Sequence, residues 1–330
     1  MTHAEFEQKG VILIALLWIL TALSMIALSF SRETFVEVAA ARNARDMAIS
    51  YYAARAGIAA TVYQIMQRRL IPRVRQLELP GPPDPIDLGL IQGKFEGAEY
   101  QVAIQDESAK INLNTVGEEQ LRTLMAAVGI NKVDADIITD SLMDWRDADN
   151  LHRPNGAEDD YYQTLNPPYK AKNGRMDTVE ELLLVRGVTR DYYYGHAERT
   201  PEGTAGFRYG LSRYFTVYST NPRINVNYAD VEVLMSVPGM TLQIAQQIYE
   251  RRKTKPFVNL EEVMRTVPGV QGPNTMALLS TDQTQVYTLT ASAHRENSKA
   301  VRVIRTVVAL EAREPSGYRV LYWNENVPRL

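Results

Sequence analysis

The longest uninterrupted apolar stretch of the chain covers residues 11–30, which include no charged side chain. At a rise of ~1.5 Å per residue, a helix of this length spans ~30 Å, the thickness of the hydrocarbon core of a bilayer. No pair of small residues typical of a signal-peptide cleavage site follows it, because Arg32 and Glu33 come next and the helical pattern continues. The pattern therefore predicts a transmembrane helix in preference to a cleaved secretory signal peptide.

The helical pattern extends well beyond this apolar run. No proline occurs between residues 11 and 70, and the segment 39–60 is rich in alanine, the strongest helix former. Apolar residues recur close to helical spacing in the second half: Phe35, Val38, Ala41, Ala48, Tyr52, Ile58, Val62 and Ile65. We therefore expect one helix of ~90 Å, with residues 11–30 in lipid, residues 31–71 packed on a folded domain, and Pro72 ending it.

Strand signals occur early and late in the rest of the chain. After a proline-rich linker at 79–87, apolar and polar residues alternate in four runs: 93–114, 285–296, 299–311 and 318–325. Asn297-Ser298 separates the second and third runs and predicts a hairpin turn. These signals predict an α+β fold, in which one sheet packs on the amphipathic half of the long helix and an all-α domain is inserted into that sheet.

The middle of the chain contains an internal repeat. The sequence INLNT at 111–115 is echoed by INVNY at 224–228, and each copy continues into a polar helix start, a leucine-rich turn and a glycine. The segments 179–189 and 260–270 repeat a second half-unit. Asparagine caps helix starts and glycine permits a close turn, so both copies resemble helix-hairpin-helix or SAM-like modules.

These patterns predict the following organisation. The segments are a leader at 1–10, a transmembrane part at 11–30, an amphipathic part at 31–71, a linker with the first strands at 72–114, an inserted helical domain with an acidic loop at 115–205, a strand returning to the sheet at 206–227, a second helix-hairpin-helix-like module at 228–282, and C-terminal strands at 283–330.

The composition of the chain excludes several classes of function. The 330 residues are enough for about two domains, and the net charge of −3 creates no strong field toward nucleic acid. There is no cysteine, which excludes disulfides, thiolate nucleophiles and cysteine-based zinc sites, and the four histidines are widely spaced. No phosphate-binding glycine loop, nucleophile elbow or zinc motif is present. We therefore expect an assembly or binding protein, not an enzyme.

Acidic residues are concentrated in the loop 144–160. Carboxylates this close together repel one another, and calcium would neutralise them because it takes about six to eight oxygen ligands. Asp147-Ala148-Asp149 has the alternation of an ion-binding loop, and Gly156 permits a sharp bend. The alternative is an ordinary acidic surface loop that Arg146 and Arg153 partly neutralise. The residues leave both interpretations open.

The N-terminus resembles that of a type IV prepilin or pseudopilin. A short polar leader ending in Lys9-Gly10 is followed at once by the hydrophobic helix, and the resemblance implies that prepilin peptidase cuts between Gly10 and Val11. The fifth residue after that cut is usually glutamate, but it is Ala15 here, as in the K subunit of type II secretion systems. A carboxylate in lipid needs a partner on a neighbouring subunit, so its loss fits a subunit with no neighbour above it.

The segments 144–169 and 179–189 also resemble that K subunit, and the resemblance extends over nearly the whole chain. It implies a minor pseudopilin at the tip of the periplasmic pseudopilus, anchored in inner-membrane lipid with its body in the periplasm. The implied partners are I- and J-type minor pseudopilins, the major pseudopilin, prepilin peptidase, and the secretin or a secreted substrate. The implied cofactor is calcium, with the following candidate ligands: Asp147, Asp149, Glu158, Asp159 and Asp160.

The second repeat unit suggests an alternative function. It resembles the DNA-binding domain of membrane-anchored competence proteins, in which backbone amides at a hairpin and nearby Lys or Arg hold phosphate. Here the turn 238–241 is followed by no basic residue until Arg251, and acidic and basic residues balance over 228–280. A membrane-anchored DNA-binding protein is therefore the second, less favoured hypothesis.

Overall fold

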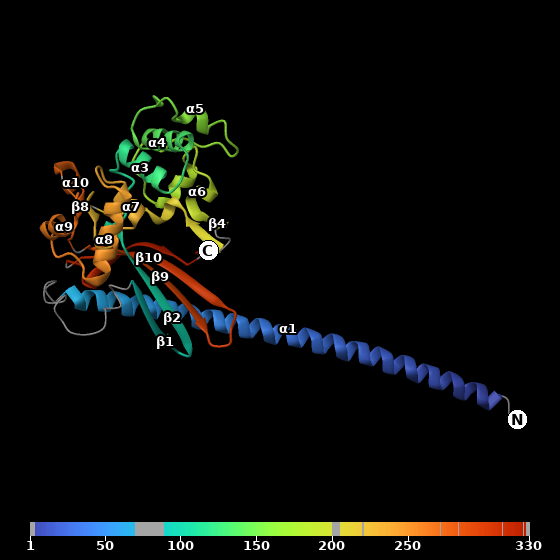
Figure 1. Ribbon diagram of the computed structural model, residues 1–330. Helices are drawn as coiled ribbons and strands as arrows, with labels where there is room; N and C mark the ends of the chain where they lie inside the picture. The colour runs from blue at the N-terminus through green and yellow to red at the C-terminus, as the bar shows by residue number, and fades with distance from the viewer. Residues whose placement is uncertain are drawn as a thin grey trace.

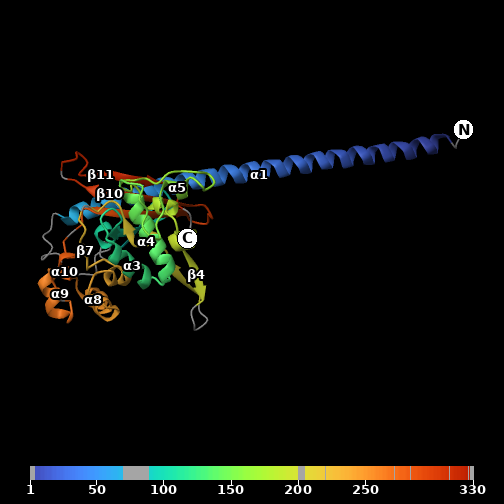
Figure 2. The ribbon, with the colours of Figure 1, turned by 90° about the horizontal axis from the view of Figure 1, so that it is seen from above.

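The computed structural model describes residues 4–69, 89–199, 205–219, 221–270, 272–282, 284–311, 313–325 and 327. A long helix, α1 (Ala4–Arg69), carries a sheet at one end, and a mainly helical body lies on the far side of that sheet (Figures 1 and 2). Pro72 and the predicted linker at 79–87 fall outside the described residues.

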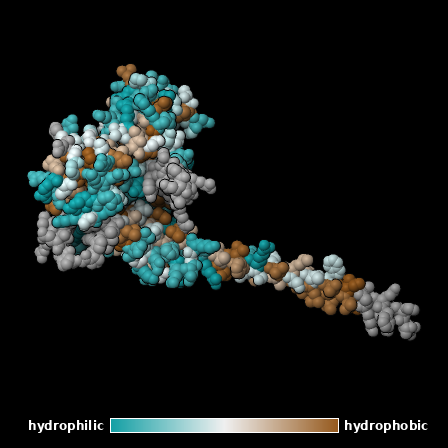
Figure 3. Space-filling model, in the orientation of Figure 1, coloured by the Kyte–Doolittle hydropathy of each residue, from teal (hydrophilic) through white to brown (hydrophobic). Residues whose placement is uncertain are grey.

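The N-terminal half of α1 stands free of the body (Figure 1). Among the described residues, α1 is the one helix long and apolar enough to cross a membrane, and none of its apolar window is buried. The space-filling view shows hydrophobic side chains gathered along the outer part of this rod (Figure 3). A single helix that continues without a break from the apolar run into the body confirms the expected rod.

The sheet has five antiparallel strands in the order β1-β2-β9-β10-β11. The strands are β1 (Leu90–Phe95), β2 (Ala98–Asp106), β9 (Val286–Arg295), β10 (Val301–Leu310) and β11 (Tyr318–Asn324). Asn297 has φ of 63° in the turn between β9 and β10, so the predicted hairpin is confirmed. Between β2 and β9 the chain leaves the sheet and forms the helical body, which confirms the α+β fold with an insertion.

The C-terminal part of α1 packs against one face of this sheet. Its buried residues Ala53, Ala54, Ile58, Val62 and Ile65 share a core with residues of the strands, which are Ile91, Ala98, Val102, Leu289, Ala291, Ala293, Ile304, Val308 and Leu310. The helix approaches β2 so closely that a Cβ on Gly57 would overlap the ring of Tyr100. Burial on this scale stabilises by ~25 cal/mol per Å² of apolar surface removed from water, which holds the helix on the sheet.

The expectation that all of residues 31–71 pack on the body is wrong for residues 31–45. Phe35 is 76% exposed, and contacts with the body begin near Asp46, which pairs with Arg295 at 2.8 Å. The reason is size: five strands ~4.8 Å apart make a sheet ~20 Å wide, whereas residues 31–71 would form a helix ~60 Å long.

The helical body has one continuous hydrophobic core, to which both repeat units contribute. The first unit contains η1 (Glu107–Ala109), β3 (Ile111–Asn112), α3 (Glu118–Ala127), α4 (Lys132–Arg146), α5 (Asp159–Tyr162), η2 (Val179–Leu184), α6 (Arg190–Tyr194) and β4 (Gly195–Arg199). The strands and turn that complete it are β5 (Ala205–Tyr209), η3 (Leu211–Arg213) and β6 (Phe215–Thr216). The second unit contains β7 (Ile224–Asn225), α7 (Val231–Met235), α8 (Leu242–Thr254), α9 (Leu260–Thr266), α10 (Pro273–Ala277) and β8 (Leu279–Ser280).

The strand expected at 206–227 does not return to the main sheet. β5 pairs with β4 in a separate hairpin, β6 pairs in parallel with β3, and β7 pairs in parallel with β8. The expected strand has no place inside the main sheet, because β2 and β9 are direct neighbours and the other neighbouring strands are joined by hairpins. The short strands β6 and β7 are buried and each closes one helical unit instead.

The two repeat units use the same hydrogen bonds. The amide of Asn114 donates to the backbone carbonyl of Met176 and accepts from its N–H, at 2.9 and 2.8 Å. Asn227 and Phe257 form the same reciprocal pair at 3.0 and 2.7 Å. In each unit an arginine near the end of the second helix donates to two backbone carbonyls, one within the asparagine motif and one just after it. This residue is Arg146 in the first unit and Arg252 in the second.

The units differ in what lies between that arginine and the residue paired with the asparagine. In the second unit residues 253–256 make this connection, and in the first unit it is made by residues 147–175. The acidic loop is therefore an insertion into one copy of a repeated frame, anchored at both ends by hydrogen bonds that the other copy shares.

Candidate metal centre

The inserted loop brings three carboxylates together. Asp147 is the residue after the last turn of α4, and Asp149 lies two residues further along the chain. Glu158 is the N-cap of α5. Each offers an oxygen, and the three oxygens lie within 4.8 Å of one another. Oxygens that share one calcium ion lie ~2.3–2.6 Å from it and therefore up to ~5 Å from one another, so this spacing fits a single ion.

The cluster contains buried oxygens without partners. Glu158 is 1% exposed, and neither of its carboxylate oxygens has a hydrogen-bond partner in the described part of the chain. Burial, followed by the charges of Asp144, Asp147, Asp149 and Asp159, raises the pKa of Glu158 to about 7. Oδ1 of Asp147 is also buried, and no other described residue forms a hydrogen bond with it. An unpaired buried carboxylate is strongly unfavourable, and either protonation or a bound cation compensates it.

Arg153 neutralises the neighbouring carboxylates but not these oxygens. Its Nη1 donates to Oδ1 of Asp144 at 2.7 Å and to Oδ2 of Asp147 at 2.8 Å, and its Nε contacts Glu118 at 3.3 Å. The hydrogen bond to Asp147 is the leading cause that raises the pKa of Arg153 above its ordinary value. Arg146, the other arginine expected to neutralise the loop, donates to backbone carbonyls instead. In the ordinary surface-loop interpretation, Arg153 therefore neutralises Asp144 and one carboxylate oxygen of Asp147. The carboxylate of Glu158 has no neutralising partner in that interpretation.

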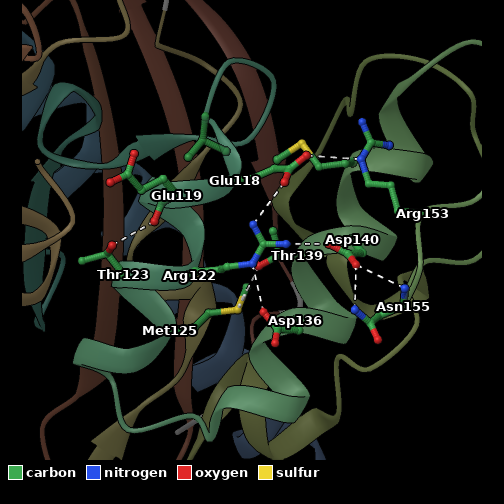
Figure 4. A network of polar contacts seen from close by, with 12 residues as sticks. Glu118, Glu119, Arg122, Thr123, Met125, Asp136, Thr139, Asp140, Arg153 and Asn155 are labelled. Carbon is green, nitrogen blue, oxygen red and sulfur yellow. Dashed lines mark hydrogen bonds and ion pairs between the residues drawn. The ribbon is translucent and has the colours of Figure 1, made fainter.

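The rest of the loop is folded onto α4. Asn155 donates its backbone N–H and its side-chain amide to Oδ2 of Asp140, at 3.2 and 2.9 Å (Figure 4). Gly156 lies against the carboxylate of Asp144 and leaves no room for a Cβ. Its carbonyl accepts from Nη1 of Arg186 at 2.9 Å. These contacts fix the path of the loop between Asp149 and Glu158.

Two of the five candidate ligands lie outside the cluster. Asp159 accepts from the N–H of Ala171 at 2.9 Å and lies 3.6 Å from Lys170. Asp160 is exposed and accepts from the N–H of Tyr161 at 2.8 Å. Calcium binding itself stays a prediction.

Sequence reasoning missed the ionic network beside the cluster. Arg122 on α3 contacts Glu118, Asp136 and Asp140, at 3.1, 3.0 and 2.7 Å (Figure 4). A signal was available, because Asp136, Asp140 and Asp144 recur at a spacing of four residues on α4 and so share one helix face.

The residues of the predicted processing site lie in α1. The backbone at Gly10 and Val11 is helical, and Ala15 is exposed on the free part of the rod. Cleavage between Gly10 and Val11 stays a prediction.

Three of the five basic residues between 228 and 280 are engaged within the molecule. Arg252 donates to the backbone carbonyls of Val226 and Ala229, at 2.8 and 2.7 Å. Arg251 lies 3.5 Å from Glu262, and Lys253 lies 2.7 Å from Glu250. Side chains held in this way are poorly placed to bind phosphates. The DNA-binding alternative is therefore not favoured.

Comparison with known proteins places this site in a family. Residues 102–195, which include the whole acidic loop, match the family model described as "Type II secretion system (T2SS), protein K". The chain carries a type II secretion protein K domain. Residues 219–277 match a helix-hairpin-helix motif, which confirms that part of the interpretation of the second unit. The three carboxylates thus lie within the segment that matches protein K, and the helix-hairpin-helix segment follows it.

Several type II secretion system K proteins are similar in sequence. That of Pectobacterium carotovorum subsp. carotovorum is 34% identical over 34% of this chain and 37% of its own length. That of Pseudomonas aeruginosa is 28% identical over 51% of this chain and 48% of its own length. That of Dickeya chrysanthemi is 42% identical over 43% of this chain and 37% of its own length. The chain thus matches half or less of the length of each of these relatives.

The fold also has a solved counterpart. A chain in the crystal structure of the GspK-GspI-GspJ complex of the enterotoxigenic Escherichia coli type 2 secretion system matches with a TM-score of 0.56 and 18% identity. The match covers 73% of this chain and 84% of the other. The fold predicted from sequence is therefore one that occurs in a solved structure.

Proposed function

We propose that this protein is a minor pseudopilin of a type II secretion system, with a structural and non-catalytic role at the tip of the pseudopilus. The observation that carries the proposal is a protein K domain inserted into a sheet that is held at the end of one long, apolar N-terminal helix. The helix would insert into the membrane and pack against other pseudopilins, and the body would cap the end of the pseudopilus.

The shape supports a position at the tip. The helical body projects to one side of α1, well beyond the width of the helix itself (Figures 1 and 2). Another subunit stacked above this one would meet the body, whereas subunits below would meet the free part of the rod. The absence of a carboxylate at Ala15 fits the same position, because a topmost subunit has no neighbour above it with which to pair.

The proposed location is the inner membrane, with a single span and with the body in the periplasm. Prepilin peptidase would remove residues 1–10, and I- and J-type minor pseudopilins and the major pseudopilin would contact the rod. The chain of similar fold was crystallised in a complex with GspI and GspJ, which supports such partners. The helical body would meet the secretin or a secreted substrate.

Processing tests the pseudopilin class directly. Co-expression with prepilin peptidase should lower the mass of the chain by that of residues 1–10, and Gly10→Leu should block the change because a bulky side chain cannot enter the cleavage site. The processed chain should then copurify with I- and J-type minor pseudopilins of the same system. A chain that keeps its full mass beside active peptidase, and that remains alone in detergent, would overturn the proposal.

We also propose that the acidic cluster binds calcium through Asp147, Asp149 and Glu158. The buried oxygens of Asp147 and Glu158 fit this ion, because calcium accepts mixed carboxylate and carbonyl oxygens in flexible geometry, whereas magnesium requires a near-ideal octahedron. Once bound, calcium would hold the end of α4 to the start of α5.

Thermal unfolding with calcium or with chelator tests this site. Calcium at ~100 times its dissociation constant should stabilise the chain by about 2.7 kcal/mol. Glu158→Gln should lose that gain, because the uncharged side chain binds the ion weakly. Asp160→Asn is the matched control, since this exposed carboxylate lies outside the cluster, and it should respond as the unmodified chain does. Equal unfolding temperatures with calcium and with chelator would refute the site.

A further inference from the structure

Asn173, which contacts the residue after Asp149, has a buried oxygen without a partner among the described residues. Its Oδ1 is inaccessible to solvent and has no hydrogen-bond partner in the part of the chain that the structure describes. Its backbone has φ of 47°, in the left-handed region that asparagine tolerates better than most residues. A buried amide oxygen normally accepts a hydrogen bond or coordinates a cation, so this atom requires an explanation.

The segment around Asn173 is attached to the neighbours of two cluster residues. Nδ2 of Asn173 donates to Oδ1 of Asn150 at 3.2 Å, and Asn150 directly follows Asp149. Two residues earlier, the N–H of Ala171 donates to Asp159, which directly follows Glu158. Two residues of extended chain span ~6–7 Å, close to the ~5 Å diameter of a calcium coordination shell. Residues 171–173 are therefore held against the residues that directly follow Asp149 and Glu158.

The orientation of the amide is set by its donor. Because Nδ2 is held by Asn150, the oxygen must point the other way. The chemistry also fits. Three carboxylates already exceed the charge of a divalent ion, and an amide oxygen adds a ligand without adding repulsion.

We infer that Oδ1 of Asn173 is a neutral ligand of the calcium ion proposed for Asp147, Asp149 and Glu158. This inference rests on the calcium site proposed above and extends it from the start of the inserted loop to its return segment. The ion would then join the end of α4, the N-cap of α5 and residue 173, which are the beginning, middle and end of the insertion.

A purely structural role is the alternative, in which Asn173 acts only by holding Asn150. Three variants separate the two roles. Asn173→Ala removes both the oxygen and the donor, Asn173→Asp keeps an oxygen but removes the donor, and Asn150→Ala removes only the acceptor. The variants are made in the full chain in detergent, and circular dichroism in chelator confirms that each remains folded.

Calcium titration gives the first measurement. Asn173→Ala should weaken calcium binding by about tenfold or more, whereas Asn173→Asp should bind at least as tightly as the unmodified chain, because a charged oxygen replaces a neutral one. Asn150→Ala should bind within about threefold of the unmodified chain. A structural role predicts the opposite pattern, in which Asn173→Asp and Asn150→Ala are both as weak as Asn173→Ala.

Europium, used as a luminescent substitute for calcium, gives a direct count of ligands. The luminescence lifetimes of bound europium in H₂O and D₂O report how many water molecules it holds. Asn173→Ala should gain about one bound water, because water fills the place of the lost oxygen, and Asn173→Asp and Asn150→Ala should gain none.

The outcomes distinguish this inference from the calcium site on which it rests. If the unmodified chain binds no calcium, both fail. If it binds calcium in a manner that Glu158→Gln abolishes, while Asn173→Ala matches it in affinity and bound water, the calcium site stands and the role of Asn173 is refuted. Equal losses in all three variants refute it as well.

Discussion

Gly156 lies directly against the carboxylate of Asp144, which is fully buried on α4. This contact, together with the hydrogen bonds from Asn155 to Asp140, determines how the acidic loop turns from Asp149 toward Glu158. Single side chains therefore decide which carboxylates converge. Glu158 and Asp159 are adjacent in sequence, yet Glu158 faces the cluster and Asp159 faces Ala171.

Replacing Gly156 with alanine should destabilise the chain. The added Cβ would overlap the Asp144 carboxylate, and buried overlaps of this kind cost about 1–3 kcal/mol. Gly174→Ala is the matched control, because a Cβ there meets nothing closer than 3.7 Å, and it should change stability by less than about 0.5 kcal/mol. Chemical unfolding of both variants measures the difference. Equal stability of the two would show that the loop can take another path.

Asp106, at the end of β2, should make stability depend on pH. Burial raises the pKa of its carboxyl to about 6, although Ser108 donates two hydrogen bonds to it. Because the pKa is higher in the folded state than in the unfolded state, the contribution of this group is fully present below pH ~4 and is lost as pH rises to ~6. Asp106→Asn should therefore be more stable than the unmodified chain at pH 8, by at most about 3 kcal/mol, and this gap should close between pH 6 and 4.

Unfolding midpoints measured from pH 4 to 8 check this sign. Asp160→Asn, at an exposed carboxylate, serves as the control and should differ little from the unmodified chain over that range. A gap between Asp106→Asn and the unmodified chain that widens on acidification would contradict the assignment.

At the scale of elements, the two repeat units are built on one hydrogen-bonded frame. Asn114 and Asn227 each bind both backbone groups of a residue far along the chain, and each frame is closed by a parallel pair of two-residue strands. The frame explains how the first unit accommodates a long insertion. Both ends of the acidic loop are fixed by contacts that the second unit forms without any such loop.

Asn114→Ala and Asn227→Ala should destabilise the chain to a similar extent. Each substitution leaves a backbone N–H and a carbonyl without their partners, at a cost of about 2–4 kcal/mol. Gln246→Ala, on the exposed surface of α8, should stay within about 0.5 kcal/mol of the unmodified chain. Denaturant titration compares the three. A large loss in only one asparagine variant would show that the units are not equivalent in energy.

At the scale of the whole molecule, the two ends of α1 suit two different environments, and an exposed segment of the helix connects them. Its apolar end suits lipid, and its C-terminal end is part of the core of the sheet. Residues 31–45 pack in neither environment, and they expose Phe35 and Val36. An isolated helical segment of this length is marginal in water, so neighbouring subunits are expected to cover it.

Hydrogen exchange should reveal these regions of α1. In detergent and without partners, amides of residues 31–45 should exchange faster than those of residues 50–66, because only the latter are held by tertiary packing. Co-assembly with other pseudopilins should slow exchange in 31–45 and leave 50–66 unchanged. Equal protection of both segments in the isolated chain would contradict this division of the helix.

The sequence by itself determined the features that local patterns encode. The uncharged run before Arg32 specifies the rod, Asn297 specifies the β9–β10 hairpin, and the duplicated asparagine motifs specify the two helical units. Each depends on residues close together in the chain, whose backbone preferences and periodicity are visible without a fold.

Only the tertiary structure decided where α1 begins to pack, why residues 206–227 do not rejoin the sheet, and which carboxylates meet. The sequence placed five acidic residues in one loop, but the contacts of Gly156 and Arg153 selected Asp147, Asp149 and Glu158. The roles of Arg122 and Asn173 were hidden for the same reason. Convergence of side chains depends on the path of the backbone between them, and that path is set by contacts between residues far apart in the chain.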